Sequence, residues 1–149
     1  MTYIQTLKPL WDKFIGYTST ISPLVDLGVR LWVANVFYTS GLTKIQTWSS
    51  TLSLFENEYA VPLLPPELAA YLGTAAEISL PIFIALGLIT RPAAIALFLF
   101  NIVAATSYPD VSALGIKDHQ VWGLLMLVTI VHGPGKLSLD HWLKTKFFK

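Results

Sequence analysis

Three ionisable side chains, Asp26, Arg30 and Glu77, lie inside stretches of the sequence that are otherwise apolar. A charged side chain at the centre of a bilayer costs roughly 2.5 to 3.5 kcal/mol, so each one needs a partner or a role. Asp26 and Arg30 are four residues apart and would share one helix face, whereas Glu77 would lie deep in a second helix. We therefore predict an ion pair between Arg30 and Glu77 near the middle of a membrane.

Other polar residues extend this cluster to two further apolar stretches. Asn101 falls in the third stretch and His119 begins the fourth. Two carboxylates against one guanidinium leave a net negative charge, for which His119 is the candidate donor. The predicted ligand-binding cluster consists of Arg30, Glu77, Asn101 and His119, with Asp26 and Tyr108 nearby.

Two interpretations of this cluster remain open. It could be a buried polar group that only fixes the register of the helices. It could instead line a cavity, capped by Trp48, Tyr59 and Tyr108, that holds a small amphipathic ligand or carries protons. A quinone is the one cofactor that we expect such a site to suit.

The sequence argues against several other kinds of chemistry. It contains no cysteine, which excludes disulfides, thiolate zinc sites and iron–sulfur clusters carried by this chain. The net charge of +1 with ten Lys and Arg is too small for a nucleic-acid-binding surface. Asp118 and His119 are adjacent, so on a helix they would point in different directions and make a poor metal site. We expect no catalytic residue and no metal site in this chain.

The elements that position the cluster are predicted to be membrane helices. Of the 149 residues, 54% are hydrophobic and 13% are charged, whereas a soluble domain carries roughly 25% charged residues. Apolar runs bounded by helix breakers lie at about 23–41, 67–89, 92–108 and 119–132, each near the ~20 residues that span a bilayer. We predict a single all-α domain over residues 1–149, a bundle of four transmembrane helices.

A shorter helix is expected in the first outer loop. Trp48, Leu52, Phe55 and Tyr59 recur every three or four residues, which predicts an amphipathic helix lying in the membrane interface.

Lysine and arginine outside the predicted spans favour cytoplasmic termini, because cytoplasmic loops carry an excess of positive charge. The predicted inner side holds Lys8, Lys13, Arg91, Lys136, Lys144, Lys146 and Lys149, and the outer side holds Lys44 and Lys117. We expect a multi-pass protein of the cytoplasmic (inner) membrane with both termini inside.

Three motifs in this order give the sequence a family resemblance. Arg30 is followed by the string from Gly41 to Lys44, Glu77 is followed by the string from Gly87 to Pro92, and the fourth run ends in Gly133-Pro-Gly-Lys-Leu-Ser-Leu-Asp140. Together they resemble the DoxX family of small four-helix membrane proteins, over about residues 26–140.

The resemblance implies a redox context or an assembly role. Members include a small subunit of an archaeal thiosulfate:quinone oxidoreductase, a mycobacterial protein linked to a membrane-associated oxidoreductase complex, and animal proteins that help receptors assemble. By this resemblance, the chain would be a quinone-side or anchoring subunit of a redox or detoxification system and not catalytic alone. It would contact membrane lipid and a membrane or membrane-associated protein, and it could form a homo-oligomer.

Two alternatives stay open. A non-enzymatic chaperone or scaffold would pack against partner proteins through small residues such as Ala34, Gly41, Gly87 and Gly123. A proton or small-molecule pathway would use the protonatable side chains of the cluster.

Overall fold

The protein is an all-helical bundle in a computed structural model that describes residues 2–148, with side chains described from residue 7 onward. This part of the chain contains six helices and no strand. They are α1 (Thr2–Gln46), α2 (Trp48–Asn57), α3 (Pro66–Leu86), α4 (Thr90–Ser107), α5 (Ala113–His132) and α6 (Leu139–Phe147).

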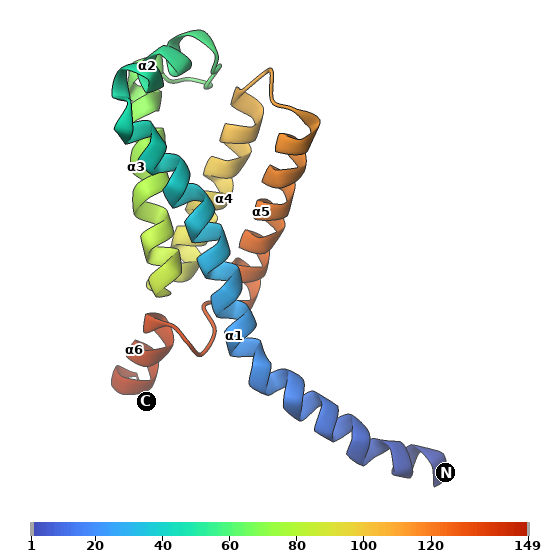
Figure 1. Ribbon diagram of the computed structural model, residues 1–149. Coiled ribbons are helices and arrows are strands. Elements are labelled where there is room, and N and C mark those ends of the chain that lie inside the picture. Colours follow the sequence, from blue (N-terminus) through green and yellow to red (C-terminus); the bar gives the residue numbers. More distant parts are fainter. Residues whose placement is uncertain (1, 149) are drawn as a thin grey trace.

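Four of the helices form a closed ring. α1 packs against α3, α3 against α4, α4 against α5, and α5 returns to α1 (Figure 1). α2 covers one end of this ring, and α6 lies at the other end, so we call these the α2 end and the α6 end (Figure 1). The core enclosed by these four helices contains Phe37, Leu97 and Met126. It also contains two small side chains of α4, Ala93 and Ala94, which let α4 approach its neighbours closely.

The first helix is far longer than the predicted 23–41. Its first half leaves the ring and projects outward beyond the α6 end (Figure 1). The polar stretch before Pro23 suggested a break, but the hydroxyls of Ser19 and Thr20 donate to the carbonyl of Gly16 at 2.9 and 2.8 Å, and the segment remains helical. Pro23 lies inside the helix and not at its start.

The boundaries of the other helices differ by smaller amounts. α3 and α4 form the expected hairpin, in which Gly87 adopts a left-handed conformation with φ of 67°. α5 begins six residues before the predicted His119 because the hydroxyl of Ser112 accepts a hydrogen bond from Gly115 N at 3.0 Å and caps the helix.

Within the described residues, three helices are long and apolar enough to cross a membrane: α3, α4 and α5. α1, which carries Asp26, Arg30 and Lys44, is not among them. The short helix predicted in the first loop is present as α2, while its position at the membrane surface stays a prediction. α2 packs on α3, with Phe55 buried against Ala69 and Ala70.

Candidate functional site

The predicted polar cluster divides between the two ends of the bundle. Glu77, His119 and Tyr108 line one cavity at the α2 end. Asn101 lies behind His119, and Arg30 and Asp26 do not line this cavity. The structure therefore brings together part of the set.

Arg30 is buried at the α6 end, and the predicted ion pair with Glu77 is wrong. Its Nη1 donates to the carbonyls of Ile84 and Ala85 at 3.1 and 3.0 Å, and its Nη2 donates to the carbonyl of Leu137. The first two carbonyls belong to the last turn of α3, where unpaired carbonyls and the negative end of the helix dipole favour a cation. Both Nη atoms of the guanidinium therefore bond to backbone carbonyls and not to a carboxylate, while its buried Nε has no hydrogen-bond partner among the described residues.

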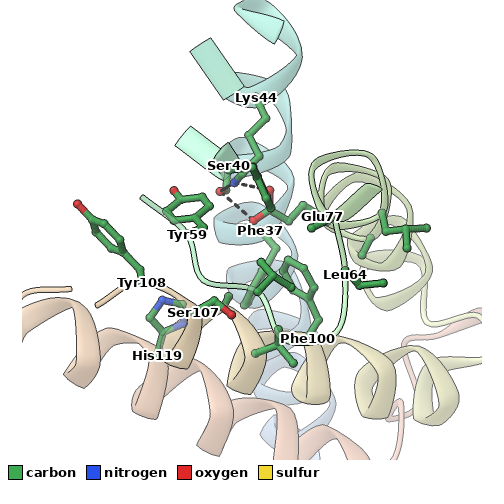
Figure 2. A pocket seen from close by; sticks show the side chains of 18 of the residues that line it. Phe37, Ser40, Lys44, Tyr59, Leu64, Glu77, Phe100, Ser107, Tyr108 and His119 are labelled. Carbon is green, nitrogen blue, oxygen red and sulfur yellow. Dashed lines mark hydrogen bonds and ion pairs between the residues drawn. The ribbon is translucent and has the colours of Figure 1, made fainter. Parts of the chain in front are cut away.

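Glu77 pairs with Lys44 from α1. Lys44 Nζ lies 2.7 Å from Glu77 Oε2, and both side chains are largely buried. Ser40 links them, because its hydroxyl accepts from Lys44 Nζ at 3.0 Å and donates to Glu77 Oε1 at 3.2 Å (Figure 2). The site therefore carries a neutral pair in place of a lone carboxylate.

Gly41 allows this pairing. A Cβ on Gly41 would lie 2.8 Å from Ile78 Cγ1 and 3.1 Å from the backbone of Glu77, so α1 and α3 touch here. Lys44 comes one turn later on the same helix, which places its stem against α3. Sequence reasoning missed Lys44 because it ended the helix at residue 41 and assigned Lys44 to a loop.

His119 is held by Asn101 through two hydrogen bonds. Asn101 Nδ2 donates to the carbonyl of His119 at 3.0 Å, which turns Asn101 Oδ1 towards His119 Nδ1 at 2.7 Å. An amide oxygen only accepts, so Nδ1 carries the proton and Nε2 keeps a free lone pair in the neutral ring. Nε2 has no hydrogen-bond partner among the described residues.

These side chains surround a cavity of about 580 Å³ beneath α2 and the loop that follows it (Figure 2). Its wall is mainly apolar, with Val36, Phe37, Leu72 and Phe100 among the lining residues. The polar residues that line it are Ser40, Lys44, Tyr59, Glu77, Ser107, Tyr108 and His119. A largely apolar cavity with a few convergent polar groups is the usual form of a small-molecule site.

The serine in this wall has an unusual environment. Ser107 is 4% exposed, and its Oγ has no hydrogen-bond partner. A buried hydroxyl without a partner costs about 1 to 3 kcal/mol, so a ligand that bonds to it recovers this free energy. Nothing in the sequence distinguished Ser107 from the other serines.

Aromatic rings close the cavity towards the α2 end. Tyr59 packs edge-to-face on Phe55 and on Tyr108, at centroid distances of 4.9 and 5.4 Å. Ala60 N donates to the carbonyl of Ser107 at 2.7 Å and fastens the loop to α4. Burial raises the pKa of the Tyr59 phenol, so this ring stays neutral. Of the three residues predicted as a cap, Tyr59 and Tyr108 line the cavity, whereas Trp48 stacks on Tyr71 outside it.

The α6 end is closed by the segment Gly133–Asp140. Asp140 accepts from Ile89 N and Thr90 N at 2.8 and 2.9 Å and so caps the start of α4. Its own backbone N–H donates to the carbonyl of Gly87 at 2.8 Å. Together with the hydrogen bond from Arg30 to Leu137, these bonds hold the segment Gly133–Asp140 against the hairpin of α3 and α4. The segment therefore anchors α6 to the bundle.

Comparison with known proteins gives the family. The DoxX family model matches residues 25–109, more than half of the chain. The chain belongs to the DoxX family. The match includes Lys44, Glu77 and Ser107 and ends before α5, so His119 and the segment Gly133–Asp140 lie outside it.

A protein of Haemophilus influenzae described only as uncharacterized is 29% identical over 141 residues, covering 89% of each chain. No solved structure matches the sequence.

Within residues 2–148, no three His, Asp or Glu side chains are grouped as metal ligands. The arrangement at the α2 end can instead hold a small molecule, donate to it from Ser107, accept from it at His119 and present a neutral ion pair.

Proposed function

We propose that this DoxX-family membrane protein binds a small amphipathic molecule with a quinone-like head group in the cavity at the α2 end. It would serve as a quinone-side or anchoring subunit of a membrane redox or detoxification system. The observation that carries this proposal is the buried, unpartnered hydroxyl of Ser107 in an apolar cavity of about 580 Å³.

The chemistry of the wall matches both states of a quinone. A quinone carbonyl accepts, and Ser107 Oγ has a donor to offer. A quinol hydroxyl donates, and His119 Nε2 has a free lone pair to accept it. The surrounding Val36, Phe37 and Phe100 provide an apolar slot for the ring.

Electrons would come from a partner protein. The sequence has no cysteine, and no metal-ligand group occurs in the described part of the chain. We therefore propose that this chain contributes ligand binding and proton exchange. Three helices able to cross a membrane support an integral location. As further parts of the proposal, α1 crosses as a fourth span, and the termini face the cytoplasm of a cell with an inner membrane.

The glycines considered for the scaffold alternative give it little support, because they already contact other parts of this chain. Gly41 is already packed against α3, and a Cβ on Gly123 would lie 3.5 Å from the side chains of Asn101 and Phe98. Gly87 faces Arg30 and Ser138. A scaffold would need another surface, because these contacts lie within the chain.

A quinone titration tests the proposal. The purified chain in detergent is titrated with a short-chain ubiquinone and a short-chain menaquinone, and quenching of tryptophan fluorescence is recorded, since Trp122 lines the cavity. Replacing Ser107 with Ala should weaken binding about fivefold, the effect of one hydrogen bond of ~1 kcal/mol. Ser79→Ala is the matched control, because Ser79 is exposed on α3 and bonds only to a backbone carbonyl.

Native mass spectrometry of protein purified gently from its own membrane gives a second measurement. A small molecule retained by the wild type and lost from Ser107→Ala supports the proposal. Absence of quinone binding in both experiments, or equal effects of Ser107→Ala and Ser79→Ala, contradicts it.

A further inference from the structure

A second cavity, of about 590 Å³, opens at the α6 end and has a different character. It lies between α1, the start of α4 and the segment that leads from α5 into α6. Its basic residues come from four parts of the chain: Arg91, His132, Lys136, His141 and Lys144. We call this cavity the basic pocket.

Two acidic residues, Asp26 and Asp140, also line the basic pocket, and Asp140 is already engaged. Asp140 places both carboxylate oxygens on the start of α4, with an additional hydrogen bond from Thr90 Oγ1 at 2.8 Å. Asp26 lies beside Gly135, and its Oδ1 is 3.9 Å from His132 Nδ1. Asp140 therefore offsets the helix dipole of α4, while Asp26 faces the backbone of Gly135 and the imidazole of His132.

Three cations remain without an acidic partner. Among the described side chains, no carboxylate lies within 4.0 Å of Arg91, Lys136 or Lys144. Arg91 Nε and Nη2 donate to the carbonyls at the end of α5, at 3.1 and 3.3 Å, which fixes the guanidinium at the rim and leaves Nη1 without a partner there. Three such cations around one cavity attract an anion with several acceptor oxygens, such as a phosphate.

The neighbouring surfaces place the basic pocket at the level of lipid head groups. On α6, Trp142 and Phe147 are exposed, and Lys146 Nζ lies 4.7 and 5.4 Å from the centres of their rings. On the projecting half of α1, Trp11 and Tyr17 are also exposed. Exposed aromatic residues mixed with lysines are typical of helices in the membrane interface.

The ends of the spanning helices agree with this placement. α3 ends, α4 begins and α5 ends at this side of the bundle (Figure 1). Ile89, which lines the pocket, is 53% exposed and gives an acyl chain an apolar contact beside the basic rim.

We propose that the basic pocket binds the phosphate of an anionic phospholipid of the surrounding leaflet. Arg91, Lys136 and Lys144 hold the phosphate, and the acyl chains follow the apolar sides of the helices. This proposal does not depend on a ligand in the cavity at the α2 end.

Lipid retention tests it on the full chain. Protein in neutral detergent is mixed with phosphatidylglycerol or with phosphatidylcholine of the same acyl chains, and bound lipid is counted by native mass spectrometry. We expect one phosphatidylglycerol per chain to be retained preferentially. The variant K136Q/K144Q should lose affinity on the order of 10- to 30-fold, given the typical contribution of a lysine near an anionic lipid.

A charge-matched variant distinguishes specific lipid binding in the basic pocket from non-specific attraction of anionic lipid to positive charge. K8Q/K13Q removes the same charge from exposed positions on α1 that do not line the pocket, and it should leave affinity within about twofold. K136R/K144R should restore binding, because it keeps both charges. Lys136 and Lys144 are exposed, so unfolding of K136Q/K144Q, followed by circular dichroism, should match the wild type.

Three results would overturn the proposal. Equal retention of the two lipids would mean that the pocket does not select an anion. Equal losses in K136Q/K144Q and K8Q/K13Q would mean that the attraction is non-specific. Displacement of the lipid by glycerol 3-phosphate at a similar concentration would mean that the pocket serves a soluble phosphate ester.

Discussion

The pair of Lys44 and Glu77 gives the sharpest test of the structure. Changing Lys44 to Met leaves a carboxylate that is 7% exposed with only the Ser40 hydroxyl beside it. Removing one partner of a buried pair typically costs about 3 to 5 kcal/mol, and because the Lys44 side chain is 17% exposed we expect the lower end of this range. Changing Glu77 to Gln should cost less, ~1 to 2 kcal/mol, because Lys44 can turn towards solvent.

The double variant separates a true pair from two independent residues. With Lys44→Met and Glu77→Gln together no charge is left unpaired, so the double variant should be more stable than Lys44→Met alone, with a coupling free energy of ~2 kcal/mol. The assay is unfolding in mixed micelles of increasing SDS content, followed by circular dichroism. Lys117→Met combined with Glu77→Gln is the control, because Lys117 is exposed and should add independently. Additive losses in the Lys44 cycle would refute the pairing.

Three further outcomes are expected. Gly41→Ala should lower the free energy of unfolding by about 1 to 3 kcal/mol, since its Cβ would meet α3 at 2.8 Å, whereas Gly28→Ala on the same helix meets nothing within 4 Å and should be neutral or stabilising in the same SDS assay. Arg30→Lys should raise hydrogen exchange in residues 133–140, because one ammonium cannot reproduce the forked contacts to two chain segments; unchanged exchange there would count against the anchoring role. Burial, aided by nearby carboxylates, raises the pKa of Tyr59 in the folded protein. The contribution of the neutral phenol to the free energy of unfolding is therefore present below the ordinary tyrosine pKa near 10 and is lost as pH rises through the higher folded value. Absorbance at 295 nm should show a late-titrating phenol that Tyr59→Phe removes.

Local signals in the sequence were sufficient for much of the fold. The hairpin at Gly87–Pro92 and the stop at Gly133 depend on glycine and proline, whose backbone preferences act without tertiary context. The periodic apolar residues of α2 likewise predicted a helix that is present. Helix ends set by a single capping hydroxyl, such as Ser112, were harder to see.

Partners of the buried charges could not be derived in the same way. Helix lengths place Arg30 and Glu77 at different depths, so the predicted ion pair would have required the arginine stem to span the difference. Carbonyls at a helix end are acceptors in every sequence, so no residue type marks the ones that Arg30 uses. Lys44 reaches Glu77 because α1 continues to Gln46, a length that the polar residues after Gly41 obscured.

The position of the candidate cavity was predicted only in part. Glu77, His119 and Tyr108 of the predicted cluster line it, as does Tyr59 of the predicted cap, whereas Arg30 and Asp26 do not. Ser107 was missed because the feature that distinguishes it, a buried hydroxyl without a hydrogen-bond partner, is visible only in the three-dimensional structure.

The closure of the α6 end affects how the topology of this protein should be mapped. Reporter fusions to successively shortened chains would remove Leu137 and Asp140, the acceptors for Arg30 and for the start of α4. A chain that ends before Leu137 would leave the guanidinium of Arg30 with the carbonyls of Ile84 and Ala85 alone, and it could insert differently from the whole protein. Single cysteines introduced into the full-length chain avoid this problem, and the absence of native cysteine means that every labelled site reports its own side of the membrane.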